Sequence, residues 1–86
     1  MPTRNVAIAS AVGLHARPAS LFVQAATATG VPITIAKEGG NAVPAGSILS
    51  IMGLGIKQGD TVVINVEGDN AEVVADNLAN ILVNAE

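Results

Sequence analysis

The sequence predicts an α+β fold, a two-layer sandwich in which helices cover one face of an open sheet. Two observations support this class. Segments of alternating apolar residues lie at hairpin distance from one another, as in an antiparallel sheet. Segments with the apolar spacing of helices lie between and after them. The 86 residues predict one domain, residues 1–86.

Four segments are predicted to be strands. The clearest is residues 61–67, T-V-V-I-N-V-E, which is rich in β-branched residues. Residues 5–10 and 31–37 also alternate between apolar and other positions. Residues 41–43 are expected to form a short edge strand that ends at Pro44.

Two helices are predicted in the first two thirds of the chain. The first runs from Ala16 to about Thr29 and ends at Gly30. Residues 47–52 are expected to form one or two helical turns with Ser47 as the N-cap. The composition of this short segment also permits a strand.

The last helix is expected to start at Asp69 or Asn70, with Glu72 at capping-box spacing from Asp69. One apolar stripe is predicted to face the core, formed by Val74, Leu78, Ile81 and Ala85. The residues left for solvent are Asp76, Asn77 and Asn80.

The composition excludes several classes of partner and site. The formal net charge is -3, the four basic residues are scattered and Phe22 is the only aromatic residue, so no nucleic-acid partner is expected. With no cysteine and one histidine, the chain lacks the residues of a metal site, and no cofactor is expected. The absence of a long apolar segment predicts a protein without a membrane partner, in the cytoplasm.

The only histidine, His15, lies where a strand-like segment turns into a helix. Gly13 can adopt backbone angles that other residues avoid, and Pro18 is tolerated in the first turn of a helix. His15 and Arg17 are therefore expected at a helix N-terminus, where free amides such as that of Ala16 favour an anion. Because neutral imidazole is a nucleophile, this arrangement predicts a phosphohistidine site.

Residues 13–20, G-L-H-A-R-P-A-S, match at every position the active-site motif of the HPr family, the histidine-containing phosphocarriers of the sugar phosphotransferase system. Residues 47–56 are similar to that family's second conserved segment. The resemblance covers essentially the whole chain. It implies a four-stranded antiparallel sheet in the order 1-4-2-3 with three helices on one face.

The resemblance also implies the function. An HPr protein accepts a phosphoryl group from phospho-enzyme I, whose ultimate donor is phosphoenolpyruvate, and passes it to sugar-specific IIA proteins or domains. His15 would be phosphorylated on Nδ1, and Arg17 would be the charge partner of the phosphate. The protein would be a carrier and a substrate of enzyme I rather than an enzyme, and a monomer with transient partners.

The resemblance implies that these partners dock on the first helix and on the short helix. The matching positions are Ala16, Ser20, Gln24, Ile48, Leu49 and Met52. Small apolar contacts of this kind suit transient complexes and depend weakly on salt.

Two alternatives stay open. In some members of the family a kinase phosphorylates the serine at the position of Ser47, which lets the protein act through a transcriptional regulator. Such members often carry a basic residue where this chain has Gly46, and an N-cap role for Ser47 has equal weight. The other alternative is an HPr-like regulatory interaction protein, a nitrogen-type or catabolite-control paralogue that acts by docking.

Overall fold

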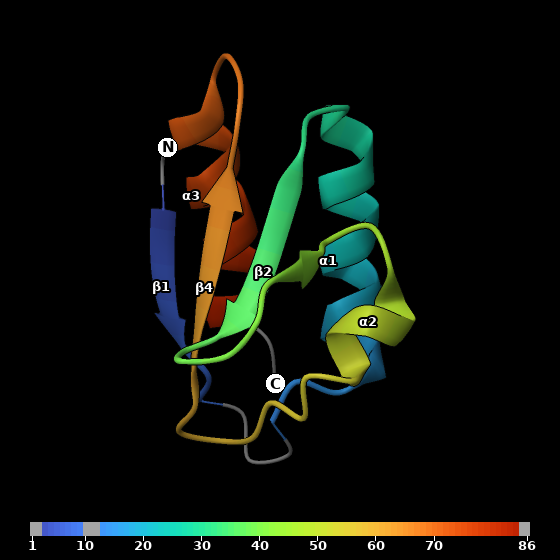
Figure 1. Cartoon of the computed structure of the whole chain (residues 1–86), viewed down its shortest axis with the longest axis vertical. Coiled ribbons are helices and arrows are strands. Elements are labelled where there is room, and N and C mark those ends of the chain that lie inside the picture. Colours follow the sequence, from blue (N-terminus) through green and yellow to red (C-terminus); the bar gives the residue numbers. More distant parts are fainter. Residues whose placement is uncertain (1–2, 10–12, 85–86) are drawn as a thin grey trace.

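The computed structural model describes residues 3–9 and 13–84. In chain order its elements are β1 (Thr3–Ala7), α1 (Ala16–Thr29), β2 (Ile33–Lys37), β3 (Val43–Pro44), α2 (Ile48–Met52), β4 (Thr61–Val66) and α3 (Ala71–Val83). The strands form one antiparallel sheet in the order β1-β4-β2-β3 (Figure 1). The predicted α+β fold and the strand order are therefore confirmed.

Strand β4 is the centre of the sheet. Val63 is opposite Asn5 of β1 on one side and opposite Ala36 of β2 on the other. Every second side chain of the strand, starting with Val62 and ending with Val66, is fully buried under the helices. The alternation of β-branched residues predicted this strand because one face of the sheet is covered and the other is not.

The outer strands differ from their predicted positions. β1 begins at Thr3, before the expected start at Asn5, and Ser10 lies outside the described residues. β3 is Val43–Pro44, so it begins two residues after the predicted Asn41 and includes Pro44 as its last residue. The amide of Ala45 bonds to β2, so by alternation the nitrogen of Pro44 points away from the sheet, where no donor is needed.

The helices form the second layer. In Figure 1, α1 and α3 lie side by side behind the sheet, and α2 lies against α1 at its N-terminal end. Phe22 of α1 and Leu78 of α3 are buried against the inner face of the sheet, together with Ile35 of β2. This packing places the start of α1, the end of α3 and the short helix α2 at one end of the molecule.

Helix α3 corrects two predictions. Asn70 precedes it with a φ of 60° and makes no side-chain cap, so the predicted capping box is not formed. The fully buried residues are Ala71, Ala75, Leu78 and Leu82. Of the predicted stripe only Leu78 is fully buried, Val74 and Ile81 are half-buried, and Ala85 lies outside the described residues. The small alanines mark the buried face weakly because they have little apolar surface.

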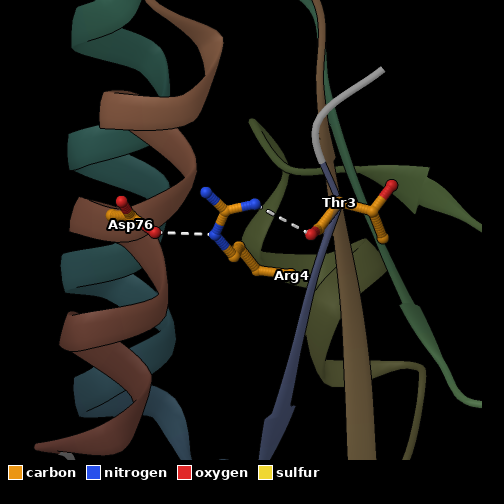
Figure 2. Close-up of polar contacts among 3 residues, drawn as sticks. All are labelled: Thr3, Arg4 and Asp76. Atoms are coloured by element: carbon orange, nitrogen blue, oxygen red, sulfur yellow. Dashed lines mark hydrogen bonds and ion pairs between the residues drawn. The ribbon is translucent and has the colours of Figure 1, made fainter.

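An ion pair joins β1 to α3. The Nε of Arg4 donates to Oδ1 of Asp76 at 2.6 Å, and its Nη1 donates to the carbonyl oxygen of Thr3 at 3.0 Å (Figure 2). The hydrogen bond to Asp76 raises the pKa of Arg4 above its ordinary value. Both side chains are accessible to water, so the pair contributes little to stability. It does give Arg4, one of the four basic residues, an acidic partner.

Candidate functional site

The loop before α1 is held by a close contact between two backbones. Gly13 has a φ of +71°, and a Cβ at this residue would lie 2.6 Å from the carbonyl oxygen of Ile56 and 2.8 Å from Cα of Lys57. The amide of Leu14 donates to that same carbonyl oxygen at 3.2 Å. Only glycine fits such a position, which confirms the prediction of unusual backbone angles at Gly13.

The segment beneath this loop is itself a tight turn. Oδ2 of Asp60 accepts a hydrogen bond from the amide of Lys57 at 2.8 Å and pairs with Nζ of Lys37 at 3.2 Å. The hydrogen bond from the backbone amide of Lys57 is the main reason why the pKa of Asp60 lies below its ordinary value, and the contact with Lys37 is the second. The turn also bonds to Ile8 through the amide of Gly59, at 2.8 Å, so it supports both ends of the loop that leads to α1.

His15 is the residue that immediately precedes α1. Its backbone is extended, with φ of -96° and ψ of -177°, and its side chain caps no amide of the helix. The amides of Ala16 and Arg17 have no acceptor within the helix, and Pro18 has no N–H. The half-buried imidazole therefore stands beside the positive end of α1, as the sequence predicted.

The imidazole ring is only loosely held. Its Nδ1 lies 3.5 Å from the carbonyl oxygen of Gly13, at the outer limit of a hydrogen bond. A contact of this length does not fix the tautomer of the ring. Nδ1 is therefore free to carry a lone pair with the proton on Nε2.

Arg17 provides a positive charge that has no partner in the described part of the chain. Its side chain is exposed, the first turn of α1 has no acidic residue, and the ion pairs seen in residues 3–9 and 13–84 involve Arg4 and Lys37 instead. Free guanidinium groups bind phosphate oxygens in a bidentate manner. The position of Arg17 beside His15 thus agrees with the predicted role of charge partner.

A hollow of about 640 Å³ opens beside His15, between α1 and the end of α3. Its walls are His15, Arg17, Pro18 and Leu21 on the α1 side, and Asn80, Ile81 and Asn84 on the α3 side. The contribution of α3 was not predicted, because Asn80 was expected in solvent and Ile81 in the core. The spacing of Asn80 and Asn84, one helical turn apart, was the available indication that they share a face.

Helix α2, which packs against α1, presents apolar side chains. Leu49 is 83% exposed, Met52 40% and Ile48 36%, whereas Ile51 between them is buried. On α1, Gln24 is exposed and its Nε2 donates to Oγ of the half-buried Ser20 at 3.4 Å. The predicted docking positions are therefore accessible and lie on adjacent helices.

Ser47 is the N-cap of α2. Its Oγ accepts a hydrogen bond from the amide of Ser50 at 3.3 Å, which confirms the capping prediction. Phosphorylation of this half-buried hydroxyl stays a prediction. The preceding Gly46 is not required by packing, since a Cβ there would meet only Oγ1 of Thr27, at an ordinary 3.8 Å.

Within residues 3–9 and 13–84, no helix is both long enough and apolar enough to cross a bilayer. Nor does this part of the chain bring three potential metal ligands of the His, Cys, Asp or Glu type together.

Comparison with known proteins identifies the family of this site. Residues 2–84 match the family described as PTS HPr component phosphorylation site. The chain belongs to the HPr family. Phosphocarrier protein HPr of Streptomyces coelicolor is 49% identical over 82 residues, which cover 95% of this chain and 88% of the relative. The general role of an HPr phosphocarrier in the phosphotransferase system therefore applies here.

Solved HPr structures share the fold. HPr-C-His from Thermoanaerobacter tengcongensis superimposes with a TM-score of 0.87 at 37% identity, covering 100% of this chain and 99% of that one. An HPr dimer from the same organism gives a TM-score of 0.67 at 41% identity, covering 91% and 87% of the two chains. Because that relative was solved as a dimer, the predicted monomeric state of this chain stays a prediction.

Proposed function

We propose that His15 accepts a phosphoryl group from phospho-enzyme I, with phosphoenolpyruvate as the ultimate donor, and passes it to sugar-specific IIA proteins or domains. One observation supports this most directly. The half-buried imidazole of His15 immediately precedes α1, two residues before Arg17, whose guanidinium has no ion-pair partner within the described residues. A nucleophile and a free positive charge at one helix N-terminus suit the reversible binding of a phosphoryl group.

The proposed transfer is a displacement at phosphorus. The lone pair on Nδ1 of His15 forms the new P–N bond, while the bond from phosphorus to the donor breaks and leaves its electron pair on the donor. The proton on Nε2 stays in place, so the step needs no general base in this chain. The carbonyl oxygen of Gly13 can only accept, so its contact with Nδ1 favours a proton on Nδ1, but at 3.5 Å the contact is too weak to hold the proton there.

The negative charge that arrives with the phosphoryl group is balanced by groups already in place. The backbone amides of Ala16 and Arg17 lie at the positive N-terminal end of α1. The first turn of α1 contains no carboxylate that would compete for the Arg17 side chain. These groups position the phosphoryl group and stabilise its charge without forming a covalent bond to it. The arrangement is therefore compatible with release of the group to an acceptor.

Docking is proposed to use the apolar surface of α2 and the neighbouring face of α1. Ile48, Leu49 and Met52 are exposed together, and no basic side chain lies between them in the sequence. Complexes formed through such a small apolar surface are transient. The proposed exchange with enzyme I and IIA proteins places the protein in the cytoplasm.

The test is phosphorylation by phosphoenolpyruvate and enzyme I, followed by mass spectrometry of the intact chain. The wild type is expected to gain one phosphoryl group that is labile in acid and stable in alkali. His15→Ala is expected to gain none, while circular dichroism shows the same fold. A normally phosphorylated His15→Ala protein would overturn the proposal.

A second stage separates the two pathways in which an HPr-like protein could act. The phosphorylated chain is offered to a sugar-type IIA and to a nitrogen-type IIA, and loss of its phosphoryl group is followed. The proposal predicts faster transfer to the sugar-type acceptor. Transfer to the nitrogen-type acceptor alone would assign the chain to the regulatory paralogues instead.

A further inference from the structure

The hollow between α1 and the end of α3 adds groups to the site that the active-site motif does not contain. Asn80 and Asn84 line it from α3, opposite Arg17 on α1, and His15 forms part of the same wall. We propose that this hollow receives the phosphoryl group of His15 and that the carboxamides of Asn80 and Asn84 donate hydrogen bonds to its oxygens. This inference rests on the proposed function, because it concerns the same phosphohistidine.

The charges around the hollow favour an anion. Six of the seven acidic residues lie within residues 3–9 and 13–84, and none of these six lines the hollow. Arg17 brings to it a positive charge that has no ion-pair partner among the described residues. Asp76, the acidic residue of α3 that is nearest in sequence, is bound to Arg4 of β1 instead. A negatively charged group therefore meets no carboxylate among the lining side chains.

The end of α3 would by itself repel an anion, since free carbonyl groups make the C-terminus of a helix negative. Two features of Asn84 reduce this repulsion. Its backbone amide bonds to the carbonyl oxygen of Asn80 at 3.0 Å, which satisfies one of these carbonyls. Its side chain and that of Asn80 present N–H groups, which attract phosphate oxygens. Carboxamides at these two positions thus offset the repulsion between the end of α3 and an anion in the hollow.

Neutral donors suit a carrier better than further positive charges would. Hydrogen bonds from charged donors are roughly twice as strong as those from neutral ones. A lysine at the position of Asn80 would hold the phosphoryl group more tightly and slow its departure. Two carboxamides orient the group and leave Arg17 as the charged contact among the residues that line the hollow.

The chain offers a matched control for this idea. Asn77 is an exposed residue of α3 like Asn80, but it lies nearly one helical turn earlier and does not line the hollow. Asn80→Asp and Asn77→Asp therefore add the same charge to the same helix. Only the first carboxylate would face Arg17 and the phosphoryl group.

The experiment measures the phosphorylated fraction of each protein at equilibrium with phosphoenolpyruvate, pyruvate and enzyme I. Asn80→Asp is expected to lower the equilibrium constant for phosphorylation about tenfold, since a carboxylate replaces a donor beside the anion. Asn77→Asp is expected to stay within about twofold of the wild type, as a screened surface charge does. Asn80→Ala, which removes the donor without adding charge, is expected to lower the constant about threefold and keeps the test valid if Asn80→Asp does not fold.

A spectroscopic readout separates this role from a structural one. The ³¹P resonance of the phosphohistidine is expected to shift in Asn80→Ala and to keep its wild-type position in Asn77→Ala. Equal equilibrium constants and equal resonances for the variants at the two positions would overturn the inference. A wild type that enzyme I does not phosphorylate would overturn the proposed function instead, so the two failures are distinguishable.

Discussion

The two sides of His15 differ in chemistry. On the α2 side, Ile48, Leu49 and Met52 present exposed apolar surface. On the α3 side there is a hollow whose walls include Arg17 and the carboxamide of Asn80. An apolar surface suits a protein partner that binds transiently, whereas hydrogen-bond donors suit an anion. Under the proposed function, partners are recruited by α2 and the phosphoryl group is stabilised at the end of α3, while α1 and its cap take part in both.

The largest effect is expected from a substitution of Gly13, which lies in the loop that positions His15. Gly13→Ala forces a residue with a Cβ into a left-handed backbone conformation and into the backbone of residues 56–57. We expect a loss of at least about 2 kcal/mol in the free energy of unfolding, measured in urea, together with slower phosphorylation of His15.

Gly39→Ala is the control for this substitution. Gly39 also has a positive φ, of +82°, but a Cβ there would meet nothing within 4 Å. The control therefore measures the conformational cost alone, and its phosphorylation rate should match that of the wild type. Equal losses of stability in the two variants would contradict the close backbone contact at Gly13.

A smaller effect, confined to the α2 side, is expected from Leu49→Glu. A charge on this exposed apolar residue should raise the KM of enzyme I for the carrier about tenfold, which corresponds to roughly 1.4 kcal/mol of binding, and leave kcat unchanged. Val73→Glu places the same charge on α3 at a residue that is 60% exposed and outside the site. Steady-state kinetics should show no change for Val73→Glu, and an equal rise of KM in both variants would remove the α2 side from docking.

The smallest effect concerns the turn that supports the loop before α1. Because the pKa of Asp60 is lowered in the folded state, its charged form stabilises the fold above the unfolded pKa of about 4. This contribution is lost as the pH falls through the lower pKa of the folded state. Asp60→Asn should therefore lose less stability than the wild type between pH 5 and pH 2, as followed by urea unfolding, and identical pH profiles would show that the carboxylate plays no part.

The sequence predicted best what depends on a local pattern. The alternation of residues 61–67 marked β4, and the glycine after Thr29 marked the end of α1. The motif around His15 located the start of α1 and the positions of His15 and Arg17 there, because these residues are neighbours in the chain. Ser47 was recognised as a cap for the same reason.

The errors arose where the fold brings distant segments together. Asn80 has a polar side chain at an exposed position, and its place beside His15 depends on how α3 packs on α1. The buried face of α3 begins with alanines, whose small side chains mark it weakly. Pro44 was expected just after the end of a strand and is instead its last residue, because a strand at the edge of a sheet accepts a proline whose nitrogen points outward.

One set of ¹⁵N NMR spectra can test whether α2 binds the partner while the end of α3 binds the phosphoryl group. The labelled protein is recorded free, phosphorylated, and bound unphosphorylated to enzyme I. Phosphorylation is expected to shift the amide resonances of Arg17 and the side-chain amides of Asn80 and Asn84, while enzyme I mainly affects the resonances of residues 48–52. Phosphorylation that leaves both carboxamides unchanged and shifts residues 48–52 instead would contradict the account.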